Sequence, residues 1–254
     1  MRTRYVDFDD RHEDLAERMR AAPELAEEFR RMWDLSWLYH ENALEGLVYT
    51  SQELELGLAN QPVADVNFVG ALRAVRGHAA AIELVRAEAR TRRPKLNVSM
   101  VKKLQETLGG GEGRPPAEWR KDMPLHRSYF HEIAQPAKIL PGLQKLFELT
   151  ESADFKAAHA IQRATRFHHG FMQVLPYTDN SGRIGRLLAA MILFQEGYLP
   201  VIIHATDRQR YYESLRQPEA ALRELTMDAI ENGLAHAEKH FAAVSERGSR
   251  RTGR

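Results

Sequence analysis

The chain lacks cysteine, long apolar runs and an excess of charge of either sign, and each absence excludes a class of function. Without cysteine it can form no disulfide, no thiolate nucleophile and no cysteine-based metal site. Its 36 Lys and Arg residues balance its 35 Asp and Glu residues. The resulting net charge of +1 gives no reason to expect nucleic acid as a partner. The longest purely apolar stretch, LLAAMILF at residues 187–194, is too short to cross a bilayer, so no membrane partner is expected.

The composition is that of a globular protein with room for a substantial core, since 43% of the 254 residues are hydrophobic. The N-terminal stretch MRTRYVDFDDRHEDLAERM is charged throughout and does not have the apolar centre of a secretory signal. We therefore expect a cytoplasmic protein. The expected divisions are a helical extension at 1–39, one domain at 40–246 and a basic tail, RGSRRTGR, at 247–254.

Helical periodicity and punctuation predict a mainly α fold with one small β-hairpin. Pro23 suits the first turn of a helix, Gly46 suits a helix end, and the run Thr50-Ser51-Gln52-Glu53 is a capping box. The first expected helix starts at Asp9 or Asp10 and ends near Arg20. Further helices are expected at about 23–45, 51 onward, 63–92, 97–109, 142–151, 153–174, 182–196, 207–216 and 219–246. The glycine- and proline-rich segment 111–124 is typical of a flexible surface loop, and HRSYFHEI at 126–133 of a short strand or hairpin.

The loop LPYTDNSGRIGR at residues 175–186 has the features of a phosphate site. A strongly apolar helix begins within it, and the start of a helix offers free N–H groups and a positive dipole end to an anion. Arg183 and Arg186 are spaced to project from the same side of that helix, and each can give bidentate hydrogen bonds to phosphate. Asp179 can hold a Mg²⁺ between phosphate oxygens. The plain alternative is an ordinary helix–turn–helix corner with surface arginines.

The same loop resembles the signature of Fic-domain proteins, HPFx(D/E)GNGRxxR, whose usual activity is transfer of AMP from ATP to a target hydroxyl. The matching residues are Pro176, Asp179, Gly182, Arg183 and Arg186, with Tyr177 as a conservative replacement of Phe. The resemblance extends over about residues 40–245. It includes His168 and Phe171, which match an HxxF pattern ahead of the signature, and the later segments GYLPVII and TDRQRYYESL.

Three positions depart from that signature. Leu175 stands where the family has its catalytic His, Asn180 replaces the first Gly, and Ser181 replaces the Asn. In the family the His takes the proton from the attacking hydroxyl, which Leu cannot do, so the catalytic base is unknown. His168 lies about two helical turns, or roughly 10 Å, before Leu175, too far for direct replacement. Asp179 is a possible base, but a poor one if it also binds Mg²⁺.

Glu45 and Gly46, in the segment NALEG, resemble the inhibitory motif (S/T)xxxE(G/N) of the same family. The resemblance implies that Glu45 pairs with Arg186, so that the γ-phosphate of a nucleotide cannot sit productively. Position 41 is Glu where that motif has Ser or Thr, so the match is partial. The alternative is that Glu45 merely precedes a helix-ending Gly.

Two further groups of residues have expected roles from the resemblance. Tyr211 and Tyr212 occupy a segment that lies near the adenine end of the nucleotide in similar proteins, where an aromatic ring can stack on a base; burial in the core is the alternative. The segment 126–133 corresponds to a hairpin flap that holds a target protein by strand addition. The expected ligand is ATP or another nucleotide, with candidate binding residues Asn180, Ser181, Gly182, Arg183, Arg186, Tyr211 and Tyr212.

These observations support two interpretations of function. The first is a Fic-type nucleotidyl or phosphoryl transferase that modifies a protein hydroxyl under restraint by Glu45. The second is a Fic protein with a degenerate signature that binds a nucleotide or a partner, with AMP transfer weakened or lost because of Leu175. A third possibility is altered chemistry, since Asn180 and Ser181 add side-chain donors to the loop. The sequence does not predict the target protein or the oligomeric state.

Overall fold

A computed structural model describes residues 2–59, 66–94, 96–109, 118–124 and 131–252 of the chain. Within these ranges the protein consists of α-helices, two short 3-10 helices and connecting loops, with no β-strand. The α-helices are α1 (Arg2–Ala21), α2 (Pro23–Leu44), α3 (Ser51–Leu58), α4 (Val66–Ala89), α5 (Val98–Leu108), α6 (Ile139–Glu151), α7 (Ala153–Ala157), α8 (Ala160–Val174), α9 (Ser181–Phe194), α10 (Arg208–Ser214) and α11 (Glu219–Thr252). The 3-10 helices are η1 (Pro136–Lys138) and η2 (Ala205–Asp207).

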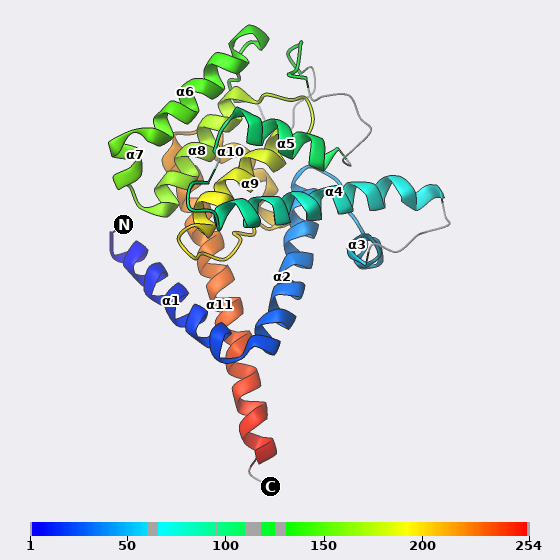
Figure 1. Cartoon of the computed structure of the whole chain (residues 1–254), viewed down its shortest axis with the longest axis vertical. Helices are drawn as coiled ribbons and strands as arrows, with labels where there is room; N and C mark the ends of the chain where they lie inside the picture. The colour runs from blue at the N-terminus through cyan, green and yellow to red at the C-terminus, as the bar shows by residue number, and fades with distance from the viewer. Residues whose placement is uncertain (1, 60–65, 95, 110–117, 125–130, 253–254) are drawn as a thin grey trace.

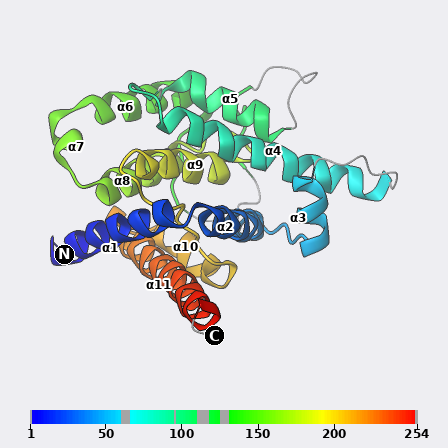
Figure 2. The ribbon, with the colours of Figure 1, turned by 60° about the horizontal axis from the view of Figure 1, so that its bottom comes forward.

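Helix α9 lies at the centre of the molecule, surrounded by other helices (Figures 1 and 2). Its sequence is apolar on every side after Arg186, and such a helix is stable only when it is buried. Helix α8 packs along one side of it and α4 along another, with α5 against α4. Every residue from Ser181 to Leu193 except Arg183 is buried. The loop that joins α8 to α9 therefore starts from a rigid core.

Helices α1, α2 and α11 lie together beside this core (Figure 1). Arg4 of α1 pairs with Glu224 and Asp228 of α11, and Arg11 pairs with Glu231 and Glu238. These ion pairs are partly exposed, so each contributes little stability. Helix α2 runs through residues 39 and 40 without a break, and the expected division there stays a prediction.

Several helix ends lie where the sequence predicts them. Pro23 opens α2, and Gly46 follows its end with a φ of 85°, a conformation that glycine adopts without strain. Thr50 and Glu53 make both hydrogen bonds of the capping box at α3. The Oδ1 of Asn97 accepts from the backbone N–H of Met100, 3.0 Å away, at the start of α5. Local capping chemistry is sufficient to place these ends.

Other expectations were wrong because distant contacts decide the outcome. Helix α1 begins at Arg2 rather than at Asp9 or Asp10, since Tyr5 and Phe8 are buried in the core. The expected helix 153–174 is two helices, because His159 caps the start of α8 through its side chain. Helix α11 continues through the expected basic tail to Thr252.

The expected hairpin at 126–133 lies mostly outside the described residues, and residues 131–133, which are described, form no strand. Most of the expected loop 111–124 also lies outside them, while residues 118–124 are irregular. In the part of the chain that the structure covers, no helix has both the length and the apolar character needed to cross a membrane.

Candidate functional site

The loop between α8 and α9 begins with a left-handed residue. Leu175 directly follows the end of α8 and has φ 46° and ψ 68°. Its N–H donates to Phe171 O over 2.9 Å. This conformation ends a helix, but it is strained for a residue with a Cβ atom, by about 1–3 kcal/mol. The Leu175 side chain is 2% exposed. The position equivalent to the expected base is therefore apolar and enclosed.

Arg120 holds this end of α8 in place. Its Nε donates to Leu175 O over 2.7 Å and its Nη2 donates to Val174 O over 3.3 Å and to Ala134 O, while its N–H donates to Pro176 O over 3.0 Å. A buried guanidinium thus satisfies carbonyl groups that a helix C-terminus leaves free. Arg120 fixes the loop relative to the segment that follows residues 125–130.

We expect Arg120→Ala to lower the free energy of unfolding by about 2–3 kcal/mol, since it removes charged hydrogen bonds to buried carbonyls. For a protein of this size that is a fall in Tm of roughly 5–10 °C, measurable by thermal unfolding followed by circular dichroism. The matched control is Arg93→Ala at an exposed arginine, expected to change stability by less than about 0.5 kcal/mol. Equal Tm values for the two variants would contradict the bracing role.

Asn180 and Ser181 both serve the loop itself. Ser181 Oγ accepts from the N–H of Tyr177 over 2.9 Å and donates to Tyr177 O over 2.8 Å. Asn180 is left-handed, with φ 68°, and its Oδ1 accepts from Arg183 Nη1 over 2.6 Å. The Ser181 hydroxyl is thus used within the loop, and the side-chain oxygen of Asn180 is used by Arg183. The possibility of altered chemistry through these two residues stays a prediction.

Arg183 is the residue at the start of α9 with unused donors. Asn180 engages its Nη1, but its Nε and Nη2 are buried and have no hydrogen-bond partner within the described chain. His78 of α4 lies near it, and burial together with the charges of Arg183 and Arg186 lowers the pKa of His78 well below its ordinary value. Two enclosed charged donors without acceptors are costly unless a ligand accepts from them.

Arg186, in contrast, has a partner for each nitrogen. Its Nε donates to Glu41 Oε2 over 2.7 Å, its Nη2 to Glu45 Oε1 over 2.8 Å, and its Nη1 to Tyr211 OH over 3.2 Å. The expected pair of Glu45 with Arg186 is present. Burial alone would lower the pKa of Arg186, but Glu41, Tyr211 and Glu45 raise it well above its ordinary value. Arg186 is therefore enclosed by its partners, although the spacing predicts that it projects from the same side of the helix as Arg183.

The carboxylate of Glu45 lies against the first turn of α9. A Cβ atom added to Gly182 would collide with Glu45 Oε1 and come within 3.0 Å of Arg186 Nη1, so only glycine allows this approach. A helix N-terminus favours negative charge at this place. Glu45 therefore occupies the position at which the sequence predicts a phosphate.

The segment that carries Glu45 is itself held. The N–H of Gly46 donates to Ala43 O, and that of Leu47 to Asn42 O, each over 3.0 Å, which completes the helix-ending motif. The carbonyl of Leu44 also accepts from Tyr212 OH, over 2.6 Å, and from the Arg208 side chain. The position of Glu45 is thus determined by both α2 and α10.

Tyr211 and Tyr212 are core residues, which is the alternative stated for them above. Tyr211 is fully buried and Tyr212 is 6% exposed, so neither ring presents a free face for stacking on a base. The OH of Tyr211 accepts from Arg186 and pairs with His168 Nε2 at 3.0 Å. Burial and the charge of Arg186 lower the pKa of His168 well below its ordinary value. His168 is committed to this network.

Asp179 is exposed in the loop. Magnesium in nucleotide sites is commonly held by one or two carboxylates together with phosphate oxygens, and Asp179 fits that arrangement as a single ligand. Among the described residues no cluster of three acidic or histidine side chains forms a dedicated metal cage.

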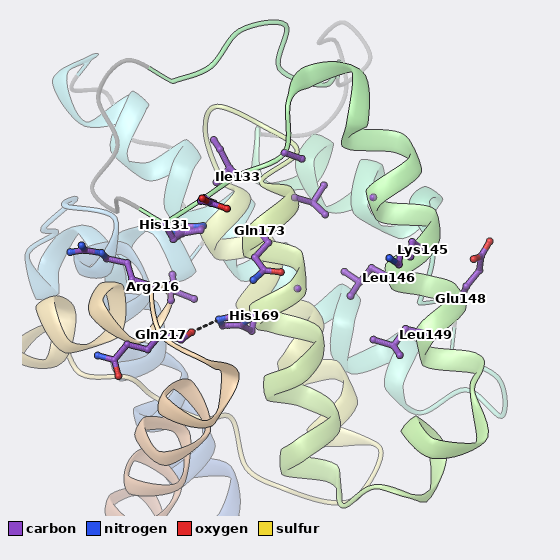
Figure 3. A pocket seen from close by; sticks show the side chains of 16 residues that line it. His131, Ile133, Lys145, Leu146, Glu148, Leu149, His169, Gln173, Arg216 and Gln217 are labelled. Carbon is purple, nitrogen blue, oxygen red and sulfur yellow. Dashed lines mark hydrogen bonds between the residues drawn. The ribbon is translucent and has the colours of Figure 1, made fainter.

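A groove of about 1120 Å³ lies beside the end of α8 (Figure 3). Residues 131–134, one face of α6, the outer face of α8 and the residues after α10 form its walls, and His169 Nε2 contacts Gln217 O at 3.0 Å across it. Gln173 points into the groove (Figure 3). None of the residues predicted from sequence to bind nucleotide lines it. Val174 lines the groove and directly precedes Leu175 in the chain.

Sequence reasoning missed Glu41 and Arg120. A signal for Glu41 was available, because it lies one helical turn before Glu45 and so shares its face of α2. The sequence contains no signal for Arg120. Its partners include main-chain carbonyls about 55 residues away, and every residue type has such a carbonyl.

Comparisons with known proteins agree with this architecture. Residues 95–193 match the family model described as Fic/DOC family. The protein adenylyltransferase Fic of Nematostella vectensis is 42% identical over 66 residues, which are 26% of this chain and 16% of that protein. The protein of the same name from Drosophila virilis is 23% identical over 190 residues, 70% of this chain and 36% of that protein. The alignments thus cover well under half the length of these curated relatives.

Two solved structures share the fold. A Fic-1 segment from Caenorhabditis elegans (residues 134–508, E274G) superposes with a TM-score of 0.78 at 18% identity, over 94% of this chain and 72% of that one. A Fic domain containing signaling protein from Bacteroides thetaiotaomicron gives 0.69 at 19% identity, over 91% of this chain and 95% of that one. Residues 95–193 of this chain thus match the Fic/DOC family model, and the chain has the helical fold of the Fic proteins with which it superposes.

Proposed function

We propose that this Fic-family chain binds a nucleotide or another phosphate ligand at the N-terminus of α9, and that its AMP transfer is weakened or lost. The observation that carries the proposal is Arg183, whose Nε and Nη2 are buried without a partner in the described part of the chain. A phosphate oxygen that accepted from both would satisfy them, aided by the helix dipole.

The weakened transfer follows from Leu175. In the signature that the loop resembles, a histidine at this position removes the proton from the attacking hydroxyl, and Leu175 has no group that can do so. His168 does not replace it, because its Nε2 is already paired with Tyr211 OH at 3.0 Å. General-base catalysis typically contributes about 10²–10⁴-fold, so its loss slows transfer without abolishing it.

The other residues of the loop would have separate roles in binding. Arg183 would hold the phosphate, Asn180 orients Arg183 through its Oδ1, and Ser181 keeps the loop closed. Asp179 would hold a Mg²⁺ against the phosphate oxygens, and the metal would neutralise part of their charge. Positioning and charge stabilisation of this kind are the main protein contributions to phosphoryl-type transfer.

The second candidate is an active transferase that Glu45 restrains. The pair of Glu45 with Arg186, at 2.8 Å, favours it, as does the name protein adenylyltransferase that the curated relatives carry. In that case ATP would be the nucleotide substrate and a protein hydroxyl the acceptor. The target segment would lie along residues 126–133, of which the described residues 131–133 line the groove.

A paired experiment separates the two candidates. Titration calorimetry with AMP and ATP, with and without Mg²⁺, measures binding, and incubation with labelled ATP and cell lysate measures transfer. We expect binding with little or no labelling of the protein or of lysate components. Strong labelling at neutral pH would favour the active transferase, whereas no binding at millimolar nucleotide would remove the site altogether.

A further inference from the structure

Two carboxylates, not one, hold Arg186. Glu41 lies in the last turn of α2 and Glu45 directly follows its end, four residues later, and both contact the guanidinium. They differ in depth, since the Glu41 side chain is 3% exposed and the Glu45 side chain is 18% exposed. Glu41 is therefore the inner partner and Glu45 the outer one.

Glu41 determines the direction of the guanidinium. It accepts from Nε, the nitrogen nearest the backbone, over 2.7 Å, and its carbonyl lies 3.5 Å from Nη2. Tyr211 OH accepts from Nη1 on the other side, and the Tyr211 ring lies 5.4 Å from the guanidinium carbon. Removal of Glu45 would free one donor of Nη2 but would leave these other contacts intact.

The charges at the start of α9 are balanced as a consequence. Arg183 and Arg186 supply two positive charges, and Glu41 and Glu45 supply two negative ones. The motif that NALEG resembles has Ser or Thr at position 41, which carries no charge. With Glu41 in place, Arg183 retains unused donors, whereas Arg186 is neutralised by a carboxylate that cannot move to water without leaving a buried cation unpaired.

We infer that Glu41 is a specificity-determining residue that keeps Arg186 away from the ligand even when Glu45 is removed. The ligand class that this arrangement favours is a nucleotide with one phosphate group at Arg183, since Arg186 is held by Glu41 and is not available to a terminal phosphate. This inference rests on the proposed function, because it concerns the same ligand site. It differs from restraint by Glu45 alone, in which release of a single carboxylate restores triphosphate binding.

The test is the ratio of ATP affinity to AMP affinity, measured by calorimetry for four proteins: the parent, Glu45→Gly, Glu41→Gln and the double variant. Glu41→Gln keeps the shape of the side chain and removes its charge. The matched control is Glu55→Gln, an exposed carboxylate of α3, which changes the net charge equally. A purely structural role for Glu41 would lower Tm without changing this ratio, so Tm is measured for every protein.

We expect Glu45→Gly to strengthen binding of both nucleotides and to change the ratio less than about threefold, because Glu41 still holds Arg186. The double variant is expected to raise the ratio roughly tenfold to a hundredfold, as a charge-assisted bond to a further phosphate becomes available. Glu55→Gln should leave the ratio unchanged. If the double variant does not fold, Glu41→Ser with Glu45→Gly provides the same test with the residue type of the resembled motif.

Two results would overturn the inference while the proposed function stands. One is a full rise of the ratio in Glu45→Gly alone, and the other is a double variant whose ratio does not exceed that of Glu45→Gly. Absence of AMP and ATP binding in all the proteins would overturn the proposed function and this inference with it.

Discussion

Leu175→His is expected to raise transfer of labelled AMP by roughly 10²–10⁴-fold over the parent protein, the usual contribution of a general base. The parent has no proton acceptor at this position, and its neighbour His168 is bound to Tyr211. A histidine here would sit at the end of α8, at the start of the loop that carries Arg183. The measurement is the rate of label incorporation into the protein and into lysate proteins at neutral pH.

The backbone at this position is compatible with the change. Leu175 has a φ of 46°, a region in which His and Asn are several-fold enriched over apolar residues. Leu175→Asn is therefore the matched control, since it shares this tolerance and is polar but is not a base. Equal rates for the two variants would contradict the assignment of base loss to Leu175. Repeating the pair in the Glu45→Gly, Glu41→Gln background tests whether restraint of Arg186 masks the gain.

Arg183→Ala is expected to weaken AMP binding roughly tenfold to a hundredfold, because a hydrogen bond between charged groups contributes about 1.5–3 kcal/mol. The reason is the pair of enclosed donors, Nε and Nη2, that have no partner in the described residues. Removing them also removes a buried charge, so the variant is expected to be no less stable than the parent. Calorimetry with AMP gives the affinity, and thermal unfolding gives the stability.

Arg93→Ala, at an exposed arginine, is the control for loss of one positive charge. A second comparison is Arg183→Lys, which keeps the charge but not the planar set of donors, and should recover only part of the affinity. Binding that is equal in Arg183→Ala and in Arg93→Ala would place the ligand elsewhere, and the groove beside α8 would then be the next candidate.

The local sequence by itself determined the helix ends and the main departure in the loop. Pro23, Gly46, the Thr50 capping box and the Asn97 cap act through bonds within a few residues, so they can be recognised without a structure. The replacement of a base by Leu175 is likewise a property of one position. The pairing of Glu45 with Arg186 was expected from the family resemblance and is present at 2.8 Å.

Only the tertiary structure decided which arginine is available to a ligand. The spacing predicts that Arg183 and Arg186 project from the same side of the helix, yet Arg186 is enclosed by residues from α2 and α10, and Glu41 is 145 positions away from it. From the sequence, Tyr211 could equally be a stacking ring or a core residue; the packing of α10 against α11, with His168 and Arg186 bonded to its hydroxyl, encloses it. The physical reason is that burial depends on contacts between distant segments, which local propensity and capping do not encode.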